Sequence, residues 1–414
     1  MEQLVERCAG LDVHQAEITA CARVPGEHDG VVELVQEFGT TTPDLLAMLD
    51  WLVALGVTEV AMESTGVFWK SPYYVLEDHF DRVLVVNAAH IKHVPGRKTD
   101  VIDAAWIAQL LAHGLLRGSF VPPPAIRELR DLTRYRKALT EERNREVNRI
   151  HKILEDAGVK LAVVASDVMG VSGRAMMRAL IEGQADPEAL ADLAKGKLRA
   201  KLPALRKALT SRFRGHHAFL LERMLAHVVD LESDIEAVQE RIEEAVAPFA
   251  RQIEVLDSIP GVGIVAAQAI LAEIGADMSV FPTAEHCASW AGMCPGQNES
   301  AGKRKSGKTR KGSRWLRTIL LECAHAAGRS KGTYLSERYR QLARRRGKKK
   351  ALVAIGHDIL VTAYQLLSTD QLYQDSGPER VKTEAEELAK RRAIRQLQSL
   401  GYRVALTSLP GTAA

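Results

Sequence analysis

The sequence predicts an α/β domain followed by a mainly helical region. Three observations point to this fold class. Apolar strand segments alternate with helix segments over the first third of the chain, two long polar helices follow a run of three prolines, and Ala- and Leu-rich helical segments fill most of the remainder. With 414 residues, the chain is long enough for two or three domains with sizeable cores.

The first third combines strand segments with helix segments. Strands are predicted at 8–13, 18–24, 31–38, 57–62 and 82–86, and helices at 42–55, 72–78 and 99–113. Pro43 lies in the first turn of the first helix, where a missing N–H is tolerated. The order βββαβαβα predicts a mixed sheet flanked by helices.

Four acidic residues stand at the ends of these elements. Asp12 lies near the end of the first strand, Glu63 ends the fourth, and Asp100 and Asp103 share one face at the start of the last helix. Gathered carboxylates repel one another unless divalent cations neutralise them, and oxygen ligands suit Mg²⁺ or Mn²⁺. Two such ions about 4 Å apart can hold the attacking and leaving oxygens of a phosphodiester. Either helical acid alone is equally explained by the helix dipole, but the set of four favours a metal site.

The residues after Asp12 argue against two other classes of protein. Exonucleases of the DEDD type carry an acid two positions later, where this chain has His14. Sugar kinases and actin-like ATPases need a Gly-rich phosphate loop at this place, which the chain lacks. His14 is interpreted as a turn residue and is not counted as a ligand.

The middle of the chain predicts two long helices. Residues 122–124 are three prolines, a stiff spacer that marks the first domain boundary. One helix is predicted at 126–156, and a second carries a heptad-like stripe of Met224, Val228, Leu231, Ile235, Val238, Ile242 and Ala245. An antiparallel pair within one chain and a coiled coil between two chains both fit. Residues 158–215 form a helical insertion of unassigned role.

A Pro-Gly-Val-Gly turn opens the C-terminal third. Gly261 and Gly263 precede an Ala-rich helix, as in a helix-hairpin-helix element. Their exposed backbone N–H groups would suit a DNA phosphate without reading the base sequence. The alternative is an ordinary glycine turn between two packed helices.

The segment 295–317 carries eight Lys or Arg residues against one Glu. Ser300 stands at its front edge, beside small residues that allow a phosphate to approach closely. We interpret the segment as a nucleic-acid site with Ser300 as the candidate nucleophile, and the alternative is a solvated basic linker. The cations expected to bind nucleic acid are Lys303, Arg304, Lys305, Lys308, Arg310, Lys311 and Arg314.

Charge and composition bound the environment of the protein. The net charge is +4, yet the start of the chain leans acidic and the excess of Lys and Arg follows Arg127, which indicates a nucleic-acid partner. Five cysteines without a CxxC pair are typical of a reducing compartment. No apolar run is expected to span a bilayer, so we expect a cytoplasmic protein without a membrane partner.

Several motifs together carry a family likeness. GLDVH around Asp12, MESTG around Glu63, KTDVIDA around Asp100 and Asp103, PGVG, and GMCPGQNESAGKRKSGKTRKGSRWLR resemble the DEDD transposases of the IS110 insertion sequences, relatives of the Piv DNA invertases. The likeness covers roughly residues 5–155 and 250–330 and implies four parts. These are a RuvC-like (ribonuclease H fold) metal domain at 1–121, a coiled-coil region at 122–250, a serine transposase domain at 251–370, and a charged tail at 371–414.

The resemblance also implies the activity and its partners. The four acids would hold ions, most simply two Mg²⁺ or Mn²⁺, and Ser300 would form a covalent phosphoserine during strand cleavage, exchange and rejoining. A bridge RNA would pair with donor and target DNA, and a homodimer would assemble into a homotetramer in a prokaryotic, nucleoid-associated setting. Two alternatives stay open: a Holliday-junction-type metal nuclease in which water attacks, and a non-catalytic nucleic-acid-binding protein.

Overall fold

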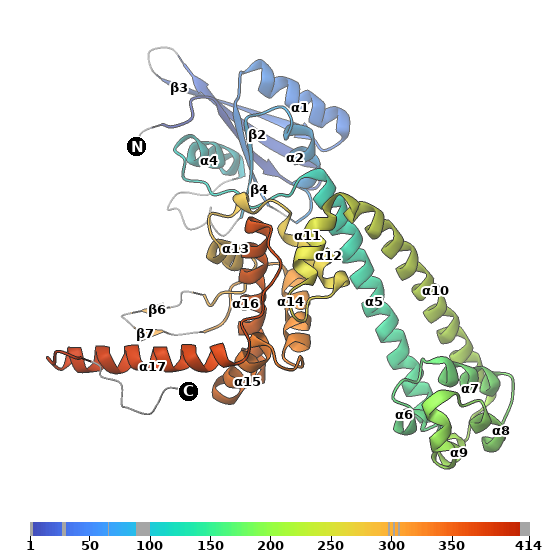
Figure 1. Cartoon of the computed structure of the whole chain (residues 1–414). Coiled ribbons are helices and arrows are strands. Elements are labelled where there is room, and N and C mark those ends of the chain that lie inside the picture. Colours follow the sequence, from blue (N-terminus) through green and yellow to red (C-terminus); the bar gives the residue numbers. More distant parts are fainter. Residues whose placement is uncertain are drawn as a thin grey trace. The chain divides into compact units, whose positions relative to one another are not determined.

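The computed structural model describes residues 3–26, 30–64, 66–87, 100–296, 299–300, 303–304 and 307–405, without the side chains of 100–102, 299–300 and 303–304. The chain divides into two compact units, Met1–Val121 and Pro122–Ala414 (Figure 1). The first is an α/β unit and the second is almost entirely helical, which confirms the predicted combination of a mixed sheet with a helical region.

The first unit is built on a five-stranded mixed sheet. Its strands are β1 (Cys8–Val13), β2 (Glu17–Pro25), β3 (Val31–Gly39), β4 (Glu59–Glu63) and β5 (Arg82–Val86), in the order β3-β2-β1-β4-β5. The first three strands form an antiparallel meander, and β4 and β5 run parallel to β1. Parallel strands need crossover connections, and the helices between β3, β4 and β5 provide them.

Helices cover both faces of this sheet. Alternate residues of β1, such as Leu11 and Val13, belong to a core with α1 (Thr42–Ala54) and α2 (Lys70–Leu76). Cys8 points to the opposite face, where α4 (Asp100–Ala112) supplies Ile107 and Leu111 to a second core. The interior strands therefore read as continuously apolar because both of their faces are buried.

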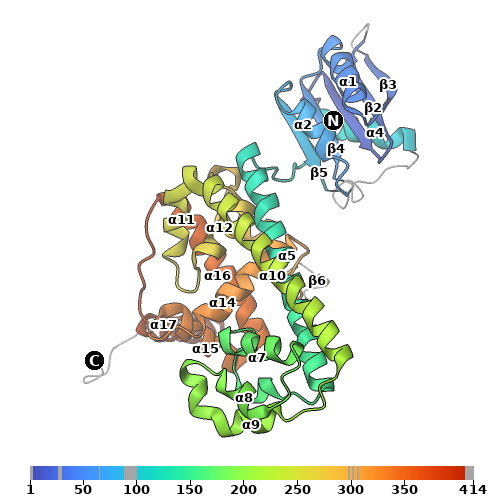
Figure 2. The ribbon, with the colours of Figure 1, turned by 90° about the vertical axis from the view of Figure 1, so that its right-hand side faces the viewer.

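An antiparallel pair of long helices begins the second unit. Figures 1 and 2 show α5 (Pro124–Asp156) and α10 (Gly215–Val246) side by side within one chain. Arg136 contacts Gln239 and Arg143 contacts Glu232, so the residue numbers rise on one helix as they fall on the other. The intramolecular pair is thus the alternative that the structure adopts.

The predicted stripe on α10 is correct in part. Val228, Leu231 and Ile242 are buried, but Leu225 is buried in place of Met224, which is only half-buried. The first half of α10 packs against the insertion as well as against α5. Because of this second contact, the buried position in this half is Leu225, one residue after the predicted Met224.

The insertion is a small helical cap at the far end of this pair. Its elements are α6 (Leu161–Val164), α7 (Val171–Ile181), α8 (Pro187–Asp192), the 3₁₀ helix Gly196–Lys201 and α9 (Leu202–Leu209). They share one hydrophobic core with the ends of α5 and α10 that includes Leu154, Met176, Leu205 and Leu221. The insertion therefore stabilises the tip of the helix pair.

The remaining helices are α11 (Ala250–Asp257), α12 (Ile264–Ile274), α13 (Ala284–Trp290), α14 (Arg314–Ala327), α15 (Tyr334–Arg346), α16 (Lys348–Thr369) and α17 (Glu379–Ser399), with 3₁₀ helices at Ala247–Phe249 and Met278–Val280. Most of them pack against α16, whereas α12 packs on α5, α11 and α14, and α17 packs on α15. By length and composition α16 is apolar enough to cross a membrane, so the expectation that no run approaches this length is wrong. Its apolar face, including Ile355 and Ile359, is buried in this unit against α11, α13, α14 and α15. That packing explains the apolar composition.

Candidate functional site

Two of the predicted acids stand side by side at one end of the sheet. The parallel register of β1 and β4 runs from Cys8–Glu59 to Leu11–Met62, and the next residues along the two strands are Asp12 and Glu63. Both side chains are half-buried. Because side chains alternate along a strand, Asp12 and Glu63 point to the same face, the one that α4 covers.

Gly10 brings α4 close to these acids. A Cβ atom at Gly10 would lie 2.2 Å from the Ala104 oxygen and 2.4 Å from the Ala108 nitrogen, so only glycine permits this approach. Cys8 Sγ donates to the Ala108 oxygen at 3.4 Å on the same face. Cys8 faces Ala108 and Gly10 faces Ala104, so α4 runs antiparallel to β1 and its first turn, with the half-buried Asp103, lies toward the Asp12 end of the strand.

The structure thus places Asp12, Glu63 and the first turn of α4, which bears Asp103, at one end of the sheet, although the described side chains of these acids do not bring three ligand atoms within 4.8 Å of one another. Asp100 begins α4 one helical turn before Asp103, and its side chain lies outside the described part of the chain. The donors are carboxylate oxygens on two adjacent strands and one helix. Such a set fits Mg²⁺ or Mn²⁺, since both cations prefer oxygen ligands.

His14 lies beside Asp12 at this strand end, although the sequence pattern alone did not indicate a ligand here. Its Nε2 atom lies 3.2 Å from Asp12 Oδ2, while the Asp12 side chain is 14% exposed. The turn between β1 and β2 folds the ring back onto the strand end, where the His14 N–H also donates to the Glu17 oxygen at 3.0 Å. The only sequence signal was a spacing of two residues beyond a strand-end acid.

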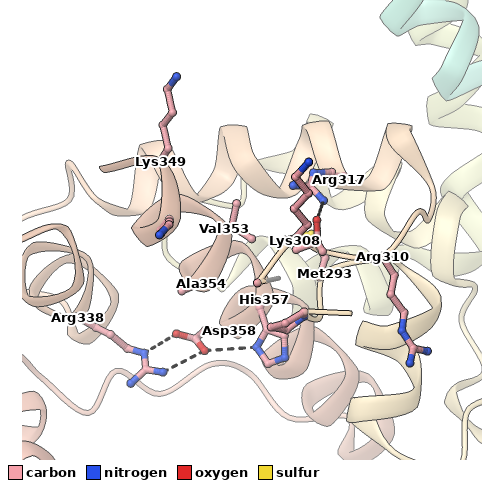
Figure 3. A pocket seen from close by; sticks show the side chains of 14 residues that line it. Met293, Lys308, Arg310, Arg317, Arg338, Lys349, Val353, Ala354, His357 and Asp358 are labelled. Carbon is pink, nitrogen blue, oxygen red and sulfur yellow. Dashed lines mark hydrogen bonds and ion pairs between the residues drawn. The ribbon is translucent and has the colours of Figure 1, made fainter. Parts of the chain in front are cut away.

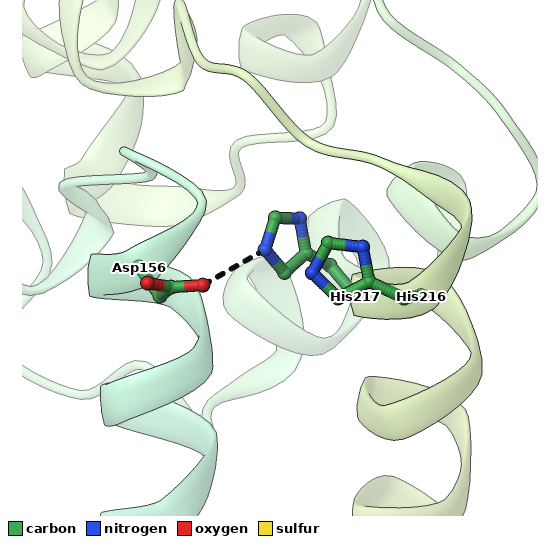
Figure 4. A group of neighbouring side chains, drawn as sticks. All are labelled: Asp156, His216 and His217. Atoms are coloured by element: carbon green, nitrogen blue, oxygen red, sulfur yellow. Dashed lines mark hydrogen bonds and ion pairs between the residues drawn. The ribbon is translucent and has the colours of Figure 1, made fainter.

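A second group of potential metal ligands lies in the other unit. Asp156, His216 and His217 place ligand atoms within 4.8 Å of one another (Figure 4). However, His217 Nδ1 accepts from the Arg214 N–H at 3.0 Å, and its Nε2 lies 3.0 Å from Asp156 Oδ2. Nδ1 caps the start of α10 and Nε2 links α10 to the end of α5, so both ring nitrogens are engaged and the group fits a helix cap better than a metal site.

The segment with Ser300 forms a two-limbed hairpin. Glu299–Ser300 (β6) pairs antiparallel with Lys303–Arg304 (β7), with Ser300 opposite Lys303. Nearer the base, the Gly296 N–H donates to the Lys308 oxygen at 2.8 Å, and the Arg310 N–H donates to the Cys294 oxygen at 3.2 Å. We call residues 294–310 the serine hairpin. The predicted loop is therefore ordered by backbone pairing at the positions that the structure describes.

Two glycines close the base of the serine hairpin. Gly292 has a φ of +69°, and a Cβ atom there would lie 2.8 Å from the Gly312 nitrogen. A Cβ atom at Gly312 would lie 2.4 Å from the Ala291 oxygen. Ser313 follows at once and caps α14, accepting from the Leu316 N–H at 3.2 Å. The hairpin is thus fixed to the helical unit at its base.

The predicted cations are distributed around this hairpin. Lys308 and Arg310 line a pocket at its side (Figure 3), and the exposed Lys311 lies near its base. The Arg314 guanidinium lies over the Trp315 ring, 4.7 Å from its centroid. Lys303 and Arg304 form the backbone of β7, and Lys305 lies outside the described residues.

The two glycines of the Pro-Gly-Val-Gly turn differ in environment. Gly261 has a φ of +89°, and a Cβ atom there would lie 2.5 Å from the Ala327 nitrogen of α14, so close packing alone requires glycine. Gly263 is exposed at the start of α12 and has no atom within 4 Å of its Cβ position. Of the pair, only Gly263 presents an open backbone at a helix N-terminus.

Comparison with known proteins agrees with both units. The chain matches the family model of the IS110-type DEDD domain, described as a transposase, over residues 9–158, and that of the transposase IS116/IS110/IS902 family over residues 253–340. The chain belongs to the IS110 family of transposases. The two matched regions contain the acid-bearing sheet and the serine hairpin, and the enzyme is a DNA transposase.

Curated relatives extend the likeness over the length of the transposase. It is 26% identical to the insertion element IS110 uncharacterized 43.6 kDa protein of Streptomyces coelicolor, over 91% of this chain and 97% of the relative. It is 28% identical to the IS900 uncharacterized 42 kDa protein of Mycobacterium paratuberculosis, over 70% and 78%. The transposase for insertion sequence element IS1111A of Coxiella burnetii is 26% identical, over 70% and 72%.

Proposed function

We propose that this transposase cleaves, exchanges and rejoins DNA strands with cations held by four acids and with Ser300 as the nucleophile. The observation that carries the proposal is the placement of Asp12 and Glu63 at adjacent strand ends, beneath the helix that bears Asp103. Carboxylate oxygens on two adjacent strand ends and one helix are the type of donor that divalent cations such as Mg²⁺ prefer. When bound, Mg²⁺ or Mn²⁺, most simply two ions, would neutralise negative charge on a phosphodiester.

The sheet supports a RuvC-like assignment for the first unit. An antiparallel meander joined to two parallel strands, in the order β3-β2-β1-β4-β5, is the expected topology of a ribonuclease H fold. Its first strand is central and carries Asp12. On this assignment Asp100 completes the acid set from the first turn of α4, one turn before Asp103.

The serine step conserves bonds and needs no outside reactant. The Ser300 oxygen forms a bond to phosphorus as the phosphorus–oxygen bond to the leaving strand breaks, and the serine proton ends on the leaving hydroxyl. In rejoining, a strand hydroxyl attacks the phosphoserine and the serine regains a proton. Because the phosphoserine keeps a phosphorus–oxygen ester bond in place of the broken one, strands can be exchanged and rejoined without net hydrolysis.

Family likeness supports the remaining parts of the proposal. We propose a bridge RNA that pairs with donor and target DNA, a homodimer that assembles into a homotetramer, and a nucleoid-associated location. The cations near the serine hairpin would neutralise nucleic-acid phosphates without reading sequence. The four-part division at 121, 250 and 370 also stays a prediction.

A covalent-capture assay tests the proposal. The protein, the transcribed RNA that flanks its gene, Mg²⁺ and labelled donor and target DNA are incubated, denatured and examined for label on the protein. We expect an adduct with the wild-type protein and none with Ser300→Ala, whereas Asp12→Asn and Asp100→Ala reduce it at least a hundredfold, on the order of one lost charge-stabilising group. Adduct formation without added RNA would remove the guide from the proposal.

The same assay separates the alternative functions. Cleaved DNA without an adduct, still dependent on Asp12, would indicate a junction-type nuclease in which water attacks. That alternative deserves the comparison because the oxygen-ligand cluster alone suffices for metal-dependent hydrolysis. DNA binding without any cleavage would indicate the non-catalytic protein.

A further inference from the structure

A pocket of about 840 Å³ lies beside the base of the serine hairpin (Figure 3). Gly307, Lys308 and Arg310 of the returning limb form one side, and Lys349 and Lys350 of α16 also line it. Its volume falls within the range of about 300–1,000 Å³ that ligand pockets occupy. Segments far apart in the sequence therefore build one site around the hairpin.

The lining of this pocket is strongly basic. Six of its side chains are cations and one is a carboxylate: Lys308, Arg310, Arg317, Arg338, Lys349 and Lys350 against Asp358. Arg338 already neutralises Asp358, to which it donates from Nε and Nη2. No carboxylate among the described residues pairs with the other two arginines or with the α16 lysines. The remaining positive charge favours an anionic ligand.

The floor of the pocket is apolar. Met293, which is 2% exposed, and the half-buried Val353 and Ala354 line it. A free phosphate would use the cations but leave this floor uncovered, and an apolar ligand would leave the cations unused. A nucleotide satisfies both, because its phosphate is anionic and its base has two apolar faces.

One wall carries an imidazole next to a neutralised carboxylate. His357 Nδ1 lies 3.6 Å from Asp358 Oδ1, and Arg338 holds that carboxylate from the other side (Figure 3). The imidazole is thus a further polar group beside the Arg338–Asp358 pair in this wall. Burial alone would lower the pKa of Arg338, but its hydrogen bonds to Asp358 together with the negative charges of Asp358 and Glu384 raise the pKa, so Arg338 stays charged.

We propose that this pocket holds one nucleotide of the DNA strand that Ser300 cleaves, with a phosphate on the basic rim and the base on the apolar floor. The inference rests on the proposed function of Ser300. Ser300 and Lys308 belong to the same paired hairpin, so a strand that reaches the serine runs along the limb whose base lines the pocket. This continuity favours the DNA strand over an RNA as the ligand. Binding of RNA in the pocket is the other outcome of the test.

Two sets of variants test the pocket. Lys349→Ala with Lys350→Ala removes two rim cations, and Ala354→Phe fills the floor without changing charge. The matched control is Arg346→Ala with Lys348→Ala, which removes two exposed cations next to the pocket that do not line it. The probes are short donor strands with 2-aminopurine at successive positions around the cleavage site, and a 2-aminopurine RNA of the same sequence.

We expect the fluorescence of one 2-aminopurine position in DNA to change on binding and to lose that change with Ala354→Phe. The lysine pair variant should weaken binding about tenfold and lower the salt slope by about two, and the control pair should change affinity less than about threefold. Equal behaviour of pocket and control pairs, with a normal wild-type adduct, would overturn the pocket assignment alone. A response to RNA and not DNA would overturn the choice of ligand, and absence of a wild-type adduct would instead overturn the role of Ser300. Should Ala354→Phe unfold, the exposed lysine pair still decides the question.

Discussion

Arg134 of α5 donates two hydrogen bonds to the carboxylate of Glu273 in α12, from Nε at 2.7 Å and from Nη2 at 3.0 Å. Glu273 is 2% exposed, and its second oxygen also accepts from Ser313 Oγ at 2.8 Å. Ser313 follows the base of the serine hairpin and caps α14. The buried Glu273 carboxylate therefore connects the long helix α5 to the residues at the base of the hairpin that carries Ser300.

Glu273→Gln should destabilise the helical unit by about 1–3 kcal/mol, because Arg134 and Ser313 lose a buried charged partner while the Arg134 side chain, 32% exposed, can still reach water. Chemical denaturation followed by tryptophan fluorescence measures the change, since Trp315 lies beside Arg134. Glu322→Gln serves as the control, because Glu322 is exposed in its pair with Lys137 and should cost under about 1 kcal/mol. Equal losses for both variants would show that the buried pair has no special role.

Glu232→Gln should make the insertion less sensitive to acid. Burial alone would raise the pKa of Glu232, but hydrogen bonds from Arg174 and Arg143 outweigh it and lower the pKa. A lowered pKa means that the stabilisation is complete above the ordinary value of 4.5 and is lost as the pH falls through the lowered value. We expect about 1–2 kcal/mol at neutral pH, discounted for partial exposure.

Hydrogen exchange across α7 at pH 7 and at successively lower pH measures this effect. Exchange in Glu232→Gln should be faster than in the wild type at neutral pH, and the difference should shrink in acid. Glu236→Gln changes an exposed acid of the same helix and should leave α7 unchanged. A difference that grows in acid would mean that the sign of the pKa shift is wrong.

Gly10→Ala should separate the acids by pushing α4 away from β1. The added Cβ atom would meet backbone atoms of Ala104 and Ala108, which cannot move without the helix. We expect a loss of stability of about 1–3 kcal/mol and a loss of metal-dependent cleavage, measured by thermal unfolding and by the adduct assay. Asp103→Asn should lose cleavage without that loss of stability, and cleavage by Gly10→Ala at the wild-type rate would contradict the placement of α4.

Gly261→Ala should destabilise the fold, whereas Gly263→Ala should not. Gly261→Ala introduces both a strained positive φ and a clash with α14, so it should destabilise the fold by more than about 1 kcal/mol. Gly263→Ala meets no neighbouring atom and should leave the midpoint of thermal unfolding unchanged. Weaker DNA binding by the stable Gly263→Ala variant would support the predicted phosphate contact, and unchanged binding would assign the turn to packing alone.

Cys294 should be the first cysteine to react with a thiol reagent at pH 8. Burial raises the pKa of Cys8 and Cys21 to about 11 and that of Cys287 and Cys323 to about 12, so few of them are thiolates. Cys294 is half-buried, and burial raises its pKa while Arg310 opposes the shift. Mass spectrometry after brief labelling should find one modified cysteine, and Cys294→Ser should remove it. Rapid labelling of Cys8 instead would indicate that α4 opens.

Local patterns in the sequence were sufficient for the elements of this protein. Strand alternation, turn residues and a proline in a first helical turn located the five strands of the sheet and the helices around it to within a few residues. The strand-end positions of Asp12 and Glu63 also follow from the sequence. These features depend on neighbouring residues, which the linear pattern records directly.

Only the tertiary structure decided how those elements meet. The register of β1 with β4 sets Asp12 beside Glu63, and Gly10 sets how closely α4 approaches. The choice of an antiparallel pair within the chain and the pocket formed by α14, α15, α16 and the serine hairpin both join residues distant in sequence. Such contacts are selected by packing, charge and shape across the fold, and no local spacing specifies them.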